Sequence, residues 1–288
     1  MHTTMRELTL QLPNLRIGAI ECGNPEAPRL LALHGWLDNA ASFSALAPHL
    51  CEHFHFVALD LPGHGRSDHA PAGMGYRFAD GIFDVLAAAD ALGWESFDLL
   101  GHSMGAGIAS LTAAACPGRI RRLVAIEALG ALTTPPEQTL VQLRRALTQA
   151  LDLVGKPLRV FATADEAIAA RMKASGLSRD AATAIVLRGI RPVPGGFSWS
   201  SDPRLTLASP QRFTEPQVLA LLRGIEARTL LILAPDSQVK PVSEEAIAAR
   251  VAEVPAIEVR ELSGGHHLHL ENPLPVANAI LEFLQSVG

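Results

Sequence analysis

Short apolar runs recur along the chain and alternate with longer segments whose apolar positions are spaced three or four residues apart. The runs are typical of buried strands, and the longer segments are typical of helices packed against a sheet. The strands predicted in this way cover residues 6–12, 15–22, 29–33, 54–59, 97–100, 123–126, 229–233 and 257–262. Helices are predicted over residues 40–50, 78–92, 104–115, 243–252 and 274–284.

This alternation predicts an α/β fold with a mostly parallel, doubly wound sheet that is covered by helices on both faces. The first two strands, joined at Pro13–Asn14, are expected to form an antiparallel pair at one edge. Ligands of such sheets bind beyond the carboxyl ends of the strands. His34, Asp60, Ser103 and Glu127 all follow predicted strands directly, so we expect them to face one crevice.

The alternation stops between residues 131 and 226. The predicted elements there are helices over 135–154, 167–174, 178–187 and 215–223, and a loop over 191–203. A helical block inserted between two strands is most simply a cap over the crevice. We therefore predict a core domain of residues 1–130 and 227–288 and a helical cap of residues 131–226.

Composition narrows the possible function. The chain has 288 residues, is 48% hydrophobic and carries a net charge of −5, which fits a globular core and lacks the basic footprint of a nucleic-acid-binding protein. Neither a signal core nor a membrane-length apolar run is present, so a soluble cytoplasmic protein is expected. Cys22, Cys51 and Cys116 are far apart and odd in number, and we predict neither a disulfide framework nor a zinc site from them.

The segment Gly101-His102-Ser103-Met104-Gly105 lies between a predicted strand and a predicted helix. It matches the G-x-S-x-G nucleophile elbow, in which a strained turn lifts the serine hydroxyl clear of the sheet. The glycines suit the two positions where so sharp a turn presses against neighbouring backbone. Ser103 is therefore the candidate nucleophile.

Three segments together resemble the α/β-hydrolase family, and the resemblance covers essentially the whole chain. They are residues 33–39 (LHGWLDN), 60–67 (DLPGHGRS) and 101–105 (GHSMG). The first and third, with residues 195–199 (GGFSW), are most similar to the serine hydrolase-like proteins within that family. The resemblance implies the core fold and an esterase-type site.

The family's G-H-x-x-x-x-E-x-P segment matches residues 265–273 and implies that His266 is the general base, with His267 as the fallback. Three histidines within four residues also suggest a metal, but no carboxylate or cysteine nearby completes a ligand set, so none is expected. For the oxyanion hole, the resemblance implies the backbone N–H groups of Trp36 and Met104. His64 and His102 are expected to form local hydrogen bonds.

The acid that orients the base has two candidates. The family's usual acid position after the cap falls on Ser237, and Asp236 lies one residue early. In the haloalkane dehalogenase branch the acid follows the strand after the nucleophile helix, where this chain has Glu127. A carboxylate that ends a wholly apolar strand also needs a cationic partner when buried. Glu127 and Asp236 both remain candidates.

The predicted reaction is hydrolysis of a small to medium apolar carboxylic ester through an acyl-enzyme formed on Ser103. The same site could instead act on a thioester, a lactone or a carbon–carbon bond, because the cap and not the fold sets specificity. A non-catalytic binding protein that kept the fold is the alternative from another class. We expect a small-molecule ester substrate, and no cofactor, metal, nucleic-acid or membrane partner.

Overall fold

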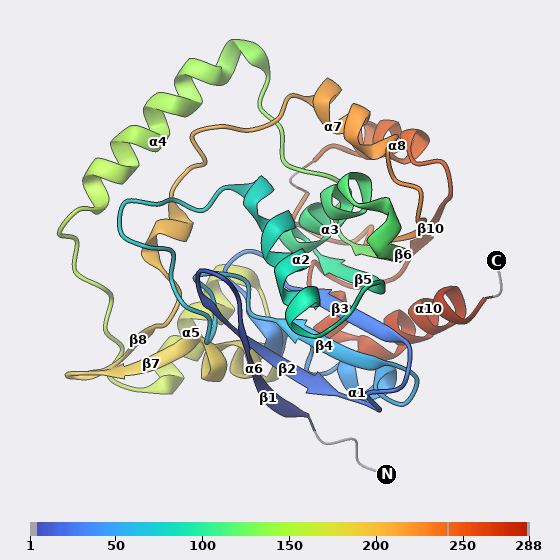
Figure 1. Cartoon of the computed structure of the whole chain (residues 1–288). Helices are drawn as coiled ribbons and strands as arrows, with labels where there is room; N and C mark the ends of the chain where they lie inside the picture. Colours follow the sequence, from blue (N-terminus) through green and yellow to red (C-terminus); the bar gives the residue numbers. More distant parts are fainter. Residues whose placement is uncertain (1–4, 241, 287–288) are drawn as a thin grey trace.

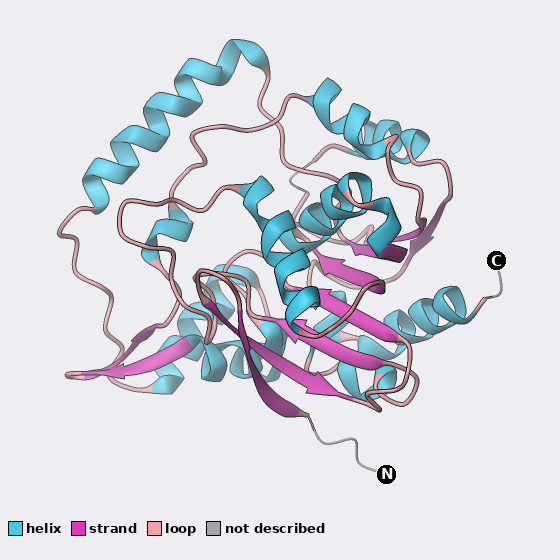
Figure 2. Cartoon of the chain, viewed as in Figure 1, coloured by secondary structure: helices cyan, strands magenta, loops and turns pink. Residues whose placement is uncertain are grey.

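The computed structural model describes residues 5–240 and 242–286. Its centre is an eight-stranded sheet in which the β1–β2 and β2–β4 pairs run antiparallel and the other neighbours are parallel (Figure 2). The strands, in spatial order, are β1 (Arg6–Gln11), β2 (Arg16–Cys22), β4 (His55–Leu59), β3 (Arg29–Leu33), β5 (Phe97–His102), β6 (Ile120–Ile126), β9 (Arg228–Leu233) and β10 (Ile257–Glu261). The predicted fold class and the antiparallel edge are confirmed.

Successive side chains of each buried strand point into two different cores, as the two-residue period of a strand requires. On β3, Leu31 and Leu33 join one core, and Leu30 and Ala32 join the other. The first core is covered by α2 (Gly81–Ala91), α3 (Met104–Ala115), α7 (Glu215–Leu222) and α8 (Glu244–Glu253). The second is covered by η1 (Ala40–Phe43), α1 (Ala47–Leu50) and α10 (Pro273–Gln285). Both faces of the sheet are therefore buried (Figure 1).

The predicted helix over 40–50 is divided in the structure. It consists of the 3₁₀ turn η1, which Asn39 caps, and the single-turn helix α1. Pro48 has no N–H to bond to the carbonyl four residues earlier, so a continuous α-helix would lose a hydrogen bond at that position. Between these pieces and the sheet, Phe43 and Leu50 are fully buried.

The segment between β6 and β9 holds α4 (Thr139–Leu153), α5 (Ala164–Ser175), α6 (Arg179–Gly189) and α7. Thr163 and Ser178 cap α5 and α6, and the side chain of each accepts a hydrogen bond from the backbone N–H three residues further along the chain. α5 and α6 share a small apolar core of their own, whereas α7 packs against α3 and α8 of the main domain. α4 lies at the periphery, apart from the other helices (Figure 1).

The segment predicted as a loop over 191–203 contains a β-hairpin, so that prediction is wrong. β7 (Ile190–Val193) pairs antiparallel with β8 (Gly196–Trp199) across Pro194–Gly195. Gly195 has φ +88°, and a proline followed by such a glycine is typical of a type II turn. The Pro-Gly pair between two apolar stretches was the signal that predicts this hairpin.

Two buried ion pairs attach α5 and α6 to the core domain. Arg188 of α6 contacts Asp60, at the end of β4, with Nη2 and Oδ2 2.8 Å apart, and both side chains are almost fully buried. Arg171 of α5 donates a hydrogen bond to Oδ1 of Asp38, which is also buried. Removing one partner of such a pair leaves an uncompensated buried charge, so these contacts fix the two helices in place.

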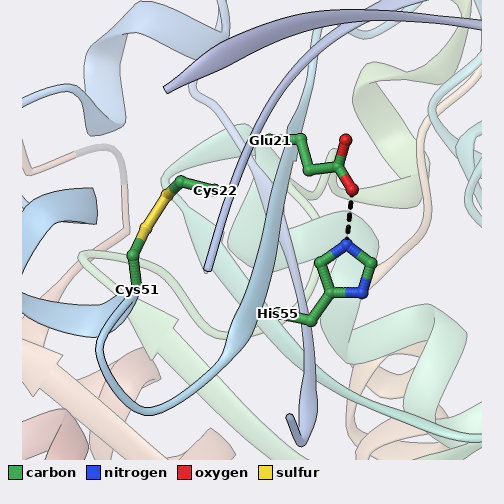
Figure 3. The surroundings of a disulfide bond; sticks show 4 residues. All are labelled: Glu21, Cys22, Cys51 and His55. Atoms are coloured by element: carbon green, nitrogen blue, oxygen red, sulfur yellow. Dashed lines mark hydrogen bonds and ion pairs between the residues drawn. A yellow bond between two sulfur atoms is a disulfide. The ribbon is translucent and has the colours of Figure 1, made fainter. Parts of the chain in front are cut away.

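Cys22 and Cys51 form a disulfide, contrary to the prediction that the cysteines form no disulfide framework (Figure 3). Pairing of β2 with β4 brings Cys22 beside the turn that follows α1, a proximity that sequence spacing does not reveal. Next to it, Glu21 accepts hydrogen bonds from Arg6 and His55. Burial alone would raise the pKa of Glu21, but these two partners bring that pKa below its ordinary value. Cys116 is a free thiol.

Candidate active site

Ser103 occupies the sharp turn between β5 and α3. Its φ of +51° and ψ of −114° lie outside the regions that side chains usually adopt, as expected for a serine held on a strained elbow. A Cβ at Gly101 would lie 2.5 Å from the backbone of Ala106, and one at Gly105 would overlap the carbonyl of Leu33. Glycine is therefore sterically required on both sides of the serine.

His266 lies in the turn between β10 and the short helix α9 (Leu268–Glu271), and its ring bridges two groups. Its Nε2 is 2.9 Å from Oγ of Ser103, and its Nδ1 is 3.1 Å from Oε2 of Glu127. With the ring proton on Nδ1, the ring donates to the carboxylate and accepts from the hydroxyl. Such a chain is the arrangement that allows a serine to lose its proton to an imidazole.

Glu127 directly follows β6 and is held by the neighbouring strand. Its N–H donates to the carbonyl of Ile232, and its Oε1 accepts the N–H of Ala234 at 2.6 Å. Oε2 is thereby left to face His266, and the carboxylate is buried. Asp236 instead has an exposed side chain, and the buried Ser237 hydroxyl bonds to the backbone of Val239.

Two backbone N–H groups are the predicted donors of the oxyanion hole. Those of Trp36 and Met104 donate no hydrogen bond to any of the residues the structure describes. Both residues line the cavity that contains Ser103. The Trp36 ring is exposed rather than part of the core, and its Nε1–H donates to the carbonyl of Leu205 in the segment between β6 and β9.

A large cavity extends from Ser103 to the segment between β6 and β9, with a volume of about 2100 Å³. Its floor includes Ser103 and His266, and its far wall includes Arg145 and Gln149 of α4. Phe78, Leu132 and Phe213 are among the apolar residues that line it. The volume exceeds the roughly 300–1,000 Å³ of common ligand pockets, so a long or bulky substrate can enter.

The model of the α/β hydrolase fold family matches residues 28–273. The chain belongs to the α/β hydrolase fold family. It is 31% identical to a serine hydrolase-like protein of Danio rerio, over 98% of this chain and 90% of that protein. It is 30% identical to serine hydrolase-like protein 2 of Homo sapiens, over 97% of this chain and 94% of that protein.

Solved structures extend this likeness to nearly the entire chain. A hypothetical protein of Pseudomonas aeruginosa is 41% identical, with a TM-score of 0.91 and coverage of 97% of this chain and 99% of that one. The thioesterase domain from the curacin biosynthetic pathway is 26% identical, with a TM-score of 0.84 and coverage of 96% and 99%. The resemblance inferred from the sequence is thus confirmed at the level of the family.

Buried histidines surround the site of this hydrolase, and sequence reasoning gave them only a local role. His102 Nε2 is 2.7 Å from the backbone carbonyl of His266, so its ring supports the loop that carries the candidate base. His64 lies between the backbone of Leu37 and Pro62. Burial lowers the pKa of His102 well below its ordinary value and that of His64 to about 3, so both rings are neutral near pH 7.

Asp38 is a part of the site that sequence reasoning missed. Burial would raise the pKa of Asp38, but the hydrogen bond from His267 and the charges of His267 and Arg171 hold that pKa well below its usual range. Asp38, His102 and His267 also lie close enough for their ligand atoms to share a metal ion. Asp38 is already bonded to Arg171 and to His267, so its charge is balanced by the protein.

In the described residues, no helix is both long and apolar enough to cross a lipid bilayer.

Proposed function

We propose that this protein is a serine hydrolase that cleaves carboxylic esters of small to medium apolar acyl groups through an acyl-enzyme. The observation that carries the proposal is the hydrogen-bonded chain from Glu127 through His266 to Ser103, which ends in the cavity. A serine hydroxyl is inert near neutral pH without a base, and the base needs a third group to fix its tautomer. Along the polypeptide the three groups follow in the order serine, acid, histidine, which is the order typical of α/β-hydrolases and supports the proposal.

In the proposed mechanism, Ser103 Oγ attacks the ester carbonyl while its proton passes to Nε2 of His266. Glu127 stabilises the imidazolium that forms, and the N–H groups of Trp36 and Met104 stabilise the oxyanion. The imidazolium then gives its proton to the leaving alcohol, which departs and leaves an acyl group on Ser103. Water, deprotonated by the same ring, hydrolyses this acyl-enzyme and restores the serine.

Replacement of Ser103 by Ala tests this proposal. The variant is expected to fold normally and to lose about 10⁶-fold in kcat on p-nitrophenyl esters, the loss typical of removing a triad nucleophile. Labelling by a fluorophosphonate probe should also disappear, because only an activated serine reacts with it. If wild-type protein is not labelled and hydrolyses no ester, the non-catalytic alternative holds.

A second candidate reaction is thioester hydrolysis. Two observations favour it: the likeness to the thioesterase domain and a cavity large enough for an extended leaving group. The same triad would perform it, since only the leaving atom changes from oxygen to sulfur. Matched pairs of acyl esters and acyl thioesters, compared by kcat/KM with thiol release followed by a thiol reagent, decide between the two.

A further inference from the structure

The peripheral helix α4 turns its apolar side away from the protein. Four leucines and the valine that follows the last turn, 49% to 81% exposed, form a stripe along its outer face: Leu140, Leu143, Leu147, Leu151 and Val154. We call these five residues the leucine stripe. On a surface helix of a single globular chain such residues normally face the core. Large exposed apolar patches mark interaction sites.

The inward side of α4 is held by polar contacts. Gln142 donates its side-chain N–H to the carbonyl of Ser209, and Gln149 accepts the N–H of Ala208, both at 2.7 Å. Ala146, between the two glutamines on this side, is buried. These contacts fix the rotation of the helix, so the leucine stripe faces outward because of the fold and not because the helix lacks attachment.

The spacing of the stripe fits pairing with a second copy of the same helix. Measured from Leu147, its members lie at −7, −4, 0, +4 and +7 along the chain. This pattern is symmetric about its centre, so a two-fold axis through Leu147 pairs Leu140 with Val154 and Leu143 with Leu151 of a second copy. Isologous dimers require such self-complementary surfaces, and rows spaced three and four residues apart interlock when helices pack.

Charge favours a second copy over a membrane surface. Helices that lie on anionic bilayers carry several lysines or arginines beside their apolar face. The charged residues of α4 are two arginines and one aspartate, and Arg145 of these lines the internal cavity, which leaves the exposed Arg144 and Asp152 with no net charge between them. The whole chain has a net charge of −5. We propose that the leucine stripe is a dimerisation surface at which two copies of this chain pair their α4 helices antiparallel.

The area of the leucine stripe limits the expected affinity of the dimer. A helix of 15 residues is about 22 Å long, so one helix pair buries less than the roughly 800 Å² per partner of a standard interface. The dimer is therefore expected to be in concentration-dependent equilibrium with the monomer. Because Gln149 and Arg145 of the same helix line the cavity, pairing also braces the wall opposite Ser103.

Sedimentation of the full chain over a range of concentrations tests the dimer. Leu147→Glu places two carboxylates at the two-fold axis and is expected to raise the dissociation constant about 100-fold or more. Leu187→Glu is the matched control, because Leu187 is also an exposed leucine on a cap helix, 58% exposed against 60% for Leu147. Circular dichroism and thermal unfolding verify that both variants fold, so the sedimentation result does not depend on whether Ser103 is catalytic.

Disulfide cross-linking tests the register in a Cys116→Ser background. Leu147→Cys is expected to cross-link with itself, whereas Leu140→Cys and Val154→Cys are expected to cross-link only when mixed. Self-cross-linking of Leu140→Cys alone would mean parallel pairing and would overturn the proposed antiparallel arrangement. A wild-type protein that stays monomeric at all concentrations, or that binds phosphatidylcholine–phosphatidylglycerol vesicles through Leu147 instead, would refute the proposal.

Discussion

Replacing Glu127 by Gln should disable the base and leave the fold intact. The introduced glutamine can keep the hydrogen bond from Ala234 N–H through its amide oxygen, because that bond to Oε1 is the shorter of the two at 2.6 Å. Its NH₂ group then faces Nδ1 of His266, from which the carboxylate accepts a hydrogen bond in the native protein. His266 must carry its proton on Nε2 instead, and that nitrogen can no longer accept the proton of Ser103.

The expected decrease in kcat has two causes, the loss of the carboxylate's attraction for the imidazolium and the wrong tautomer of His266. A carboxylate and an imidazolium about 4 Å apart attract by roughly 4 kcal/mol at an effective dielectric constant near 20, which corresponds to about 10³ in rate. The wrong tautomer adds to this, and an acid-to-amide change in another serine enzyme costs about 10⁴ in kcat. We therefore expect kcat of Glu127→Gln to fall by about 10³ to 10⁴.

The assay is steady-state hydrolysis of p-nitrophenyl esters, with the rate of fluorophosphonate labelling as a second reading of serine activation. Asp236→Asn is the matched control, and its kcat should stay within about twofold of wild type because its side chain is exposed. Thermal unfolding shows whether either change affects stability. Retention of activity by Glu127→Gln together with a large loss in Asp236→Asn would refute the reasoning and assign the acid to Asp236.

Three further predictions concern stability. Burial, together with the nearby charge of Asp80, raises the pKa of Asp84 to about 6. Asp84→Asn should therefore stabilise the protein by up to about 3 kcal/mol at pH 7.5 and by little at pH 4. Urea unfolding at both pH values measures this difference. The sign follows because the pKa is raised on folding: the stability contribution is complete below the ordinary pKa of 3.8 and is lost as the pH rises through about 6, where the buried carboxylate ionises. Arg188→Ala should cost about 3–5 kcal/mol by leaving Asp60 buried without its cation, again measured in urea. Reducing the Cys22–Cys51 disulfide should cost about 3 kcal/mol for a loop of this length, measured as a lower Tm, and equal Tm values with and without reductant would contradict it.

The parallel sheet could be predicted from the sequence because its strands are short, apolar and separated by helical patterns. Each of β3, β4, β5, β6 and β9 begins within three residues of its predicted start. The division of residues 40–50 and the β7–β8 hairpin depended on Pro48 and Pro194–Gly195, which outweighed the apolar periodicity around them. Apolar periodicity predicts which side chains lie on the same face of a helix or strand. It does not predict where a proline or a glycine interrupts that element with a turn.

The orientation of helix α4 also could not be predicted from the periodicity of its sequence. Its amphipathic pattern predicts a helix, and the helix forms, but a helical period does not say which side faces inward. Contacts of Gln142 and Gln149 with residues 208 and 209, far along the chain, decide the orientation. The disulfide is a second case, since the partner of Cys22 is set by the pairing of β2 with β4.

Glu127 and Asp236 remained alternatives in the sequence for a topological reason. β6 and β9 are neighbours in the sheet, so their carboxyl ends reach the same point beside His266. A carboxylate from either strand could fill it, and the difference lies in the backbone. Glu127 has φ +61° and is bonded to Ile232 and Ala234 at the end of β9, which turns its side chain toward the imidazole. Oε2 of Glu127 is thereby bonded to Nδ1 of His266, whereas the side chain of Asp236 is exposed to solvent.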